Sequence, residues 1–175
     1  VARVFSEELR QAVDALSPAR RMVAPNAFHH LAIPSWQTAY PVAKTHAAPG
    51  LRKQRPDIAF DTNLGTGHNP DWGEQIDQVH FGDTLLMTEL VFFHAASGMA
   101  LFTDHLQHDP PSWFTGWRGV VARLDLMTGS EPATPGKFPP AFMDRKATQS
   151  ARNVVLDWPA RKVVLARGAP VHPVQ

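Results

Sequence analysis

The stretch Met22-Val23-Ala24-Pro25-Asn26-Ala27-Phe28-His29-His30-Leu31 joins a short apolar run to a polar loop with two adjacent histidines. The apolar run predicts a strand, and Pro25-Asn26 is typical of the loop that ends one. We expect a helix to follow, in the region of Ser35–Pro41, so that the histidines lie where a strand passes into a helix. A loop in this position can hold a metal site or a buried polar cluster.

Strands and helices alternate through the sequence on either side of this loop. Ser6 precedes two acids and an apolar face of Leu9, Val13 and Leu16, as expected of a capped helix. Ser17-Pro18 ends that helix. Further strands are predicted at Lys44–Ala47, Val79–Phe81, Leu90–Phe93 and Met99–Thr103, the last two joined by the turn Ala95-Ala96-Ser97-Gly98. This alternation predicts an α/β fold rather than a helical bundle.

Two helices and one strand are expected in the last third of the chain. The run Ser112–Leu126 predicts a helix with Trp113, Trp117, Val121 and Leu124 on one side. We expect the two tryptophans to pack in the core, and the alternative is that they serve an interface with a partner. A connector rich in proline and glycine leads to a second helix at Ala147–Leu156. A final strand, Lys162–Ala166, ends at Arg167-Gly168.

Length and composition limit the classes of protein to consider. The 175 residues, 43% hydrophobic and 19% charged, predict one globular domain over residues 1–175. Basic and acidic residues number 17 and 16, so a nucleic-acid partner is not expected. The chain has no long apolar run and no signal-peptide pattern, and we expect a cytoplasmic protein with no transmembrane segment. Because there is no cysteine, any metal must be held by imidazole and carboxylate groups, which suit Zn, Fe or Mn.

Two groups of residues are candidates for a functional site. Adjacent side chains at the start of a helix diverge by about 100°, so His29 and His30, close to Asn26, are either separate ligands or locally hydrogen-bonded residues. His94 and Asp104 close the two arms of the predicted hairpin. A buried Asp104 would need a cation or several donors, and it serves either as a metal ligand or as a loop cap.

The remaining candidates carry less information. His105 and His108 are three residues apart, but Pro110-Pro111 interrupts any helix there, so we expect both to be solvated. His46, His68, His80 and His172 stand in no group. Arg167, delivered by a buried strand, is expected to pair with a core carboxylate. Nucleotide-binding and serine-hydrolase motifs are absent.

Four segments recur in the same order in one known family: Pro25–Leu31, Pro49–Asp57, Val91–Ser97 and Thr103–Asp104. The chain therefore resembles an uncharacterised domain-of-unknown-function family that looks like a divergent branch of the metallo-β-lactamase-like fold. The resemblance covers nearly the whole chain. It implies an α/β fold of the αββα sandwich type, lacking some opening strands, with site residues at one edge of the sheets.

The resemblance also implies roles for individual residues. His29-His30 resembles the end of the superfamily's HxHxDH loop, with Pro25 and Ala27 in place of its first two histidines. Asp104 resembles the metal-bridging aspartate, and Arg167 stands where the last metal histidine is expected. Arginine does not ligate metals, because it stays protonated at accessible pH.

Two functions follow as hypotheses. The first is a metal-dependent hydrolase with a degenerate site and a small-molecule substrate. Its metal ligands would be His29, His30, His94 and Asp104. Of these, Asp104 and His94 would also act in catalysis. The second is a non-catalytic subunit or binding module in which Arg167 replaces the metal and pairs with Asp104. An exposed sheet edge would then favour a homo-oligomer or a partner protein.

Overall fold

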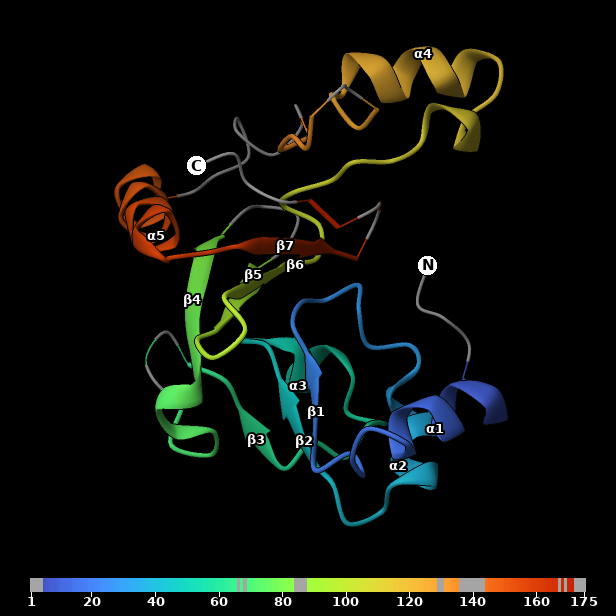
Figure 1. Cartoon of the computed structure of the whole chain (residues 1–175), viewed down its shortest axis with the longest axis vertical. Helices are drawn as coiled ribbons and strands as arrows, with labels where there is room; N and C mark the ends of the chain where they lie inside the picture. The colour runs from blue at the N-terminus through green and yellow to red at the C-terminus, as the bar shows by residue number, and fades with distance from the viewer. Residues whose placement is uncertain are drawn as a thin grey trace. The chain divides into compact units, whose positions relative to one another are not determined.

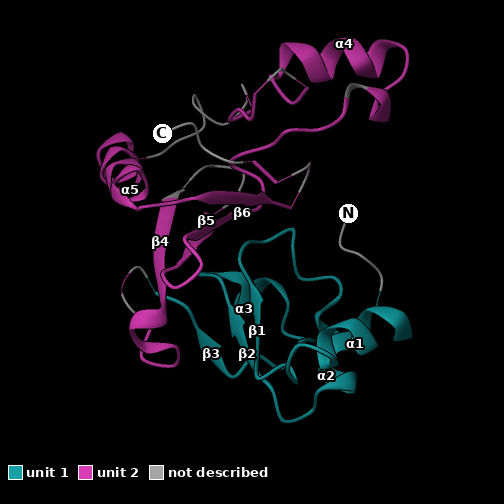
Figure 2. Ribbon diagram, viewed as in Figure 1, with its two compact units in different colours: residues 1–65 teal, residues 66–175 magenta. Residues whose placement is uncertain are grey.

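The computed structural model describes residues 5–65, 67, 69–83, 88–128, 131–135, 144–166, 168 and 170–171. The chain divides into two compact units, Val1–Gly65 and Thr66–Gln175, coloured separately in Figure 2. Each unit has its own sheet with helices beside it (Figure 1). The predicted single domain over residues 1–175 stays a prediction.

Unit 1 contains a parallel three-stranded sheet in the order β1-β2-β3. Arg21 of β1 pairs with Lys44 of β2, and the register continues to Ala24 opposite Ala47. Parallel strands require crossover connections, which here include short helices. The elements of the unit are α1 (Glu7–Asp14), β1 (Arg21–Ala24), α2 (Ile33–Ala39), β2 (Lys44–Ala47), α3 (Leu51–Gln54) and β3 (Thr62–Asn63).

The sequence explains why these elements form. Ser6 caps α1, because its Oγ accepts a hydrogen bond from the Leu9 amide at 3.2 Å. Trp36 of α2 stacks on Tyr40 with ring centroids 5.8 Å apart. The core of the unit consists of the buried side chains Met22, Ala24, Ile33, Tyr40, Ala43, Ala47, Leu51, Ile58 and Phe60.

Unit 2 is built on a four-stranded sheet in the order β4-β5-β6-β7. Strands β5 and β6 form the predicted antiparallel hairpin, and Gly98 in its turn has a φ of 60°, which favours glycine. Strand β7 then pairs with β6 in parallel. The strands are β4 (Ile76–Asp83), β5 (Thr88–His94), β6 (Met99–Phe102) and β7 (Lys162–Leu165).

The helices of unit 2 differ in how much they are packed. Helix α5 (Arg145–Asp157) packs against β4, and just after it Trp158 stacks on Phe93 of β5 with centroids 5.3 Å apart. Helix α4 (Trp117–Leu124) packs extensively against none of the helices and strands in the described part of the chain. Short 3₁₀ turns, η1 (Gly73–Gln75) and η2 (Pro111–Trp113), precede β4 and α4.

Most of the predicted elements are confirmed. They include the five strands predicted before residue 105 and the first and last predicted helices, which are α1 and α5. The helix expected at Ser112–Leu126 is shorter, since Gly116 with a φ of 60° separates it from η2. Core packing of its tryptophans was the wrong prediction, because Trp113 and Trp117 are 59% and 73% exposed. Among the described residues we find no helix with the length and apolarity of a membrane span.

Candidate functional site

The loop after β1 in unit 1 is shaped by Asn26, which is fully buried. Its Oδ1 accepts hydrogen bonds from the amides of Phe28 and His29, each at 2.9 Å. An Asn side chain that binds the backbone two and three residues ahead closes a turn. Asn26 therefore has a positioning role, and it fixes both histidines at the carboxyl end of a parallel strand, where ligands of such sheets commonly bind.

His30 is only 7% exposed and lies in an environment that disfavours its charged form. Burial lowers its pKa below 6.5, and the nearby Arg55 guanidinium lowers it further. Arg55 is itself paired with Asp57 at 2.6 Å, which holds the pKa of that carboxyl at about 2. His30 is therefore a neutral imidazole at pH 7, the protonation state that a metal ligand or general base requires.

His29 has different surroundings from the buried His30. It is partly exposed and lines a hollow of about 340 Å³. The other residues that line the hollow are apolar. They belong to α1, β1 and α2, with Ala32 directly before α2: Leu9, Met22, Val23, Ala32, Ile33 and Trp36. Of the two histidines, only His29 lines this hollow.

A third histidine of unit 1 lies inside the sheet. His46 of β2 is fully buried, and its Nδ1 contacts the Thr62 hydroxyl of β3 at 2.6 Å. The expectation that it stands in no group of site residues stays a prediction. The available indication of its burial was its place inside the predicted strand Lys44–Ala47.

In unit 2 the polar centre is Glu89, a residue that the sequence analysis did not single out. It is fully buried in β5, and its carboxylate accepts hydrogen bonds from the amides of Thr103, Asp104 and His105 at 2.7, 2.9 and 2.9 Å. The Nδ1 of His105 adds a fourth contact at 3.0 Å. Glu89 thus holds the chain where it leaves β6.

The pKa of Glu89 reflects opposing influences. Burial, the largest, raises the pKa, but the hydrogen bond and charge of His105 and the amides of Thr103 and Asp104 together outweigh it. The net pKa is lowered below 4.5. The carboxylate is therefore ionised at neutral pH, and the described donors around it compensate for its burial.

The segment after β6 is buried, contrary to expectation. Asp104, His105, Gln107 and Asp109 are exposed by 8%, 1%, 2% and 1% respectively. The prediction that His105 is solvated was wrong, because Glu89 and the Phe81 ring, 5.1 Å away, enclose its imidazole. Asp104 is among these buried residues, and its role as metal ligand or loop cap stays a prediction. His108 is only partly buried.

His94 and Asp104 are not brought together. His94 ends β5 opposite Met99, and its Nδ1 contacts the Ser97 hydroxyl of the hairpin turn at 2.7 Å. The backbone amide of Asp104 donates to the Glu89 carboxylate at the other end of β5, and Glu89 is five residues from His94 along the strand. At about 3.3 Å per residue that is about 16 Å, so a single ion bound by both is incompatible with this register.

The described residues do not fit a three-ligand metal centre. No group of three or more His, Asp or Glu side chains that could hold a metal ion occurs among them, whereas a catalytic Zn site takes about three protein ligands. Arg167, His68 and His172 lie outside the described residues. The individual metal-binding roles of His29, His30, His94 and Asp104, and the pairing of Arg167 with Asp104, remain predictions.

Comparison with known proteins shows the fold but no close relative. No protein-family model matches the chain, and no curated protein matches it. Among solved structures it is similar to TMB-1, studied for substrate and inhibitor binding, at 15% identity and a TM-score of 0.60 over 95% of this chain and 68% of that one.

Two further structures are metallo-β-lactamases. The DIM-1 enzyme is 12% identical, with a TM-score of 0.60 over 95% of this chain and 70% of its own. The enzyme from Hirschia baltica is 15% identical, with a TM-score of 0.60 over 95% and 69% of the two chains. Together with the two sheets and their helices, these matches confirm the predicted α/β class and the metallo-β-lactamase-like fold.

Proposed function

We propose that this chain is a binding module of metallo-β-lactamase-like fold that associates with a second copy of itself through α4. The observation that carries the proposal is an exposed apolar surface, which we call the α4 surface. Its six large side chains are between 51% and 78% exposed: Trp113, Trp117, Val120, Val121, Leu124 and Leu126.

The spacing of these residues suits a helix partner. Trp117, Val120, Val121 and Leu124 stand at positions i, i+3, i+4 and i+7, the pattern of a single apolar stripe. Ala122 is the buried residue of the helix, at 2% exposure, so the stripe is not the face that packs inward. Figure 1 shows α4 apart from the four-stranded sheet of its own unit. Contiguous exposed apolar surface of this kind marks an interaction site.

A second copy is the occupant that the stripe fits best, because the same surface on both partners makes a closed two-fold pair. In an antiparallel arrangement Trp117 of one copy lies opposite Leu124 of the other. Arg118, whose guanidinium lies 5.8 Å from the Trp117 ring, then faces the end of the partner helix, where Asp125 follows. Apolar burial supplies the energy, at about 1.5 to 3 kcal/mol per large side chain.

Sedimentation velocity tests the proposal over about 1 to 100 µM. The wild-type chain is expected to shift from monomer to dimer, and Trp117→Glu and Leu124→Glu to remain monomeric. Leu156→Glu is the matched control, since Leu156 is a 63% exposed leucine on α5. A wild-type chain that is monomeric throughout, or a Trp117→Glu variant that dimerises as well as the control, contradicts the proposal.

The second candidate is a metal-dependent hydrolase acting on a small-molecule substrate. The contact between Glu89 and the Nδ1 of His105 favours it, since metal-binding and catalytic histidines are commonly oriented by a carboxylate in this way. The described residues do not by themselves supply the ligands. The fold similarity to metallo-β-lactamases supports this candidate only as an analogy.

Metal analysis separates the two candidates. Protein purified without chelator should contain close to one equivalent of Zn, Fe or Mn if the hydrolase is correct, and His105→Ala should lose it. His108→Ala is the control, because His108 is only partly buried and no metal role is assigned to it. Less than about a tenth of an equivalent, unchanged in His105→Ala, contradicts the hydrolase and leaves the binding module.

A further inference from the structure

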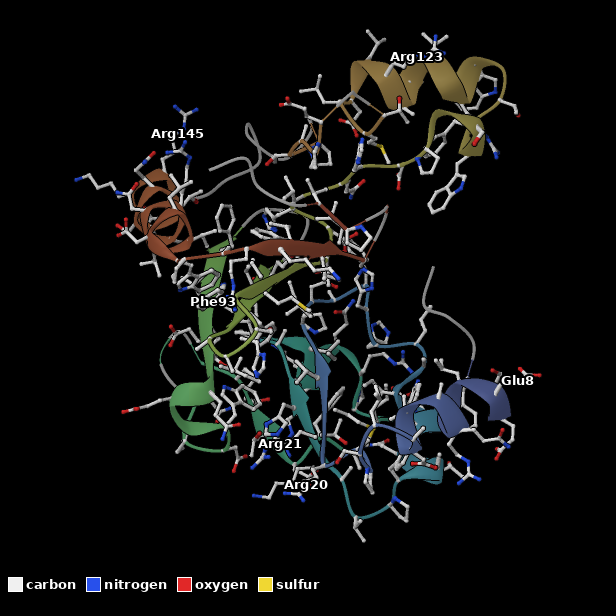
Figure 3. The ribbon with its side chains drawn as sticks, in the orientation of Figure 1. Glu8, Arg20, Arg21, Phe93, Arg123 and Arg145 are labelled. Atoms are coloured by element: carbon white, nitrogen blue, oxygen red, sulfur yellow. The ribbon has the colours of Figure 1, made fainter. Side chains whose placement is uncertain are left out.

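Three cationic residues lie at the amino edge of the unit 1 sheet. Arg20 and Arg21 enter β1, and Lys44 enters β2. Because the strands are parallel, both begin at the same edge, where Arg21 pairs with Lys44 in the register. The Lys44 amide also donates to the Arg20 carbonyl at 3.0 Å. Arg20 and Arg21 are both visible at the start of β1 in Figure 3.

These side chains surround a hollow of about 480 Å³. Its lining contains the three cations and no acid: Pro18, Ala19, Arg20, Arg21, Val42 and Lys44. The volume lies within the range of small-molecule sites, about 300 to 1,000 Å³. The hollow is separate from the one that His29 lines, which shares none of these residues.

Two other arginines of unit 1 have carboxylate partners, whereas Arg20 and Arg21 have none among the described residues. Arg10 pairs with Glu7 at 2.6 Å, and Arg55 pairs with Asp57 at 2.6 Å. Within the described part of the chain neither Arg20 nor Arg21 forms an ion pair. Neighbouring like charges without a counter-ion repel each other, and a bound anion relieves that repulsion.

From this geometry we propose that Arg20, Arg21 and Lys44 form a phosphate-binding hollow. A guanidinium presents donors in a planar fork that fits two oxygens of a phosphate, and Lys44 adds a third positive charge beside it. A phosphate dianion is favoured over a single carboxylate because three cations face one space. The site shares no residue with the α4 surface, with the His29–His30 loop or with the segment after β6.

The phosphate has two sources that share this chemistry, a free phosphorylated molecule and a lipid headgroup. Val42, in the lining, is 93% exposed, and Leu16, four residues before Arg20, is 89% exposed. Apolar side chains that project beside cations also suit the surface of an anionic bilayer. The experiment therefore needs one soluble probe and one vesicle probe.

Calorimetry with inorganic pyrophosphate, at constant ionic strength set with NaCl, is the first arm. The full chain is expected to bind with a dissociation constant of about 10 µM to 1 mM. The double variant Arg20→Ala/Arg21→Ala should bind at least about tenfold more weakly. Lys53→Ala removes an exposed cation from α3 and should leave the affinity unchanged.

Co-sedimentation with phosphatidate vesicles, compared with phosphatidylcholine vesicles, is the second arm. Pyrophosphate binding that the double variant loses supports a free phosphorylated ligand. Binding to phosphatidate vesicles alone, lost in the same variant, supports a lipid headgroup. Absence of binding in both arms, or binding that the double variant retains, overturns the proposal. Far-UV circular dichroism verifies that the variants are folded.

Discussion

Glu89 shows how one buried carboxylate can organise a segment that looks like an exposed loop. Its four donors come from residues 103–105, which follow β6, while Glu89 itself belongs to β5. The carboxylate therefore ties two neighbouring strands together at one end of the sheet. An ion in this position is tolerated only because its donors are in place.

Replacing Glu89 by glutamine should destabilise the protein strongly. The amide keeps one acceptor oxygen, but its NH₂ group faces amides that also donate, so buried donors lose their acceptor. The expected loss is about 3 kcal/mol in the free energy of unfolding, measured by urea denaturation. Glu74→Gln, at an exposed position in η1, is the control and should change little. A loss no larger than the control would contradict this role.

The ionisation of Glu89 also gives a pH dependence with a definite sign. Its pKa is lowered in the folded chain, so the unfolded chain binds more protons below pH 4.5. The contribution of Glu89 to stability is therefore complete above pH 4.5 and is lost as the pH falls through the folded value. Unfolding measured from pH 7 to pH 3 should show this fall, with a smaller slope in Glu89→Gln. An equal slope in the two proteins is the contrary result.

His30 should titrate below the normal range of histidine. NMR should place its pKa below 6.5, because burial and the Arg55 charge both disfavour the imidazolium. Arg55→Gln should raise the pKa, and Asp57→Asn should lower it further, since Asp57 acts in the opposite direction. Lys53→Gln is the control on neighbouring α3. A His30 pKa at or above 6.5, or one insensitive to Arg55, disproves this account.

The chemistry of single residues could be predicted only in part. Asp104 was identified from its place at the end of an apolar run. His105 was missed because the neighbouring Pro110-Pro111 suggested a solvated loop, whereas Glu89, 16 residues earlier, encloses it. The available indication was Glu89 itself, an acid within an apolar strand. A carboxylate there must find donors, but the sequence alone does not identify them.

Among the helices, α5 illustrates local signals that agree with the packing. Asp144 precedes the helix, and its Oδ1 accepts from the amides of Lys146 and Ala147, each at 2.9 Å. Removing this cap with Asp144→Ala should lower the free energy of unfolding by about 1 kcal/mol. Asp144→Asn keeps an acceptor and should lie close to wild type in the same urea titration. Equal losses in both variants would show that the cap does not act through its oxygen.

Helix α4 illustrates the opposite case. The local pattern correctly predicts the helix, but the prediction that its apolar side packs in the core is wrong. The period of Trp117, Val121 and Leu124 predicts an amphipathic helix, and the helix forms there. The sequence cannot distinguish a stripe that faces the core from one that faces another chain, because both need the same side chains. Only the exposed fractions of these side chains in the structure distinguish a stripe that faces the core from one that does not.

For the chain as a whole, the order of elements was more predictable than the site. Apolar runs of strand length and capped helices predict an α/β fold, and structures only 12% to 15% identical share it. Residue identities at a site are not preserved by such a fold. The predicted ligands lie at opposite ends of the β5–β6 hairpin, His94 beside the turn and Asp104 after β6, a separation that depends on the register of β5 with β6.

Association of two copies through α4 is tested most directly by a label on the α4 surface. The chain has no cysteine, so Leu124→Cys provides a unique site for a polarity-sensitive dye. On dilution from about 100 µM to 1 µM, the emission of this dye should shift to the red as the second copy leaves. A dye at Leu156→Cys on α5 should not respond. An emission from residue 124 that is independent of concentration, or an equal shift at residue 156, would contradict the account.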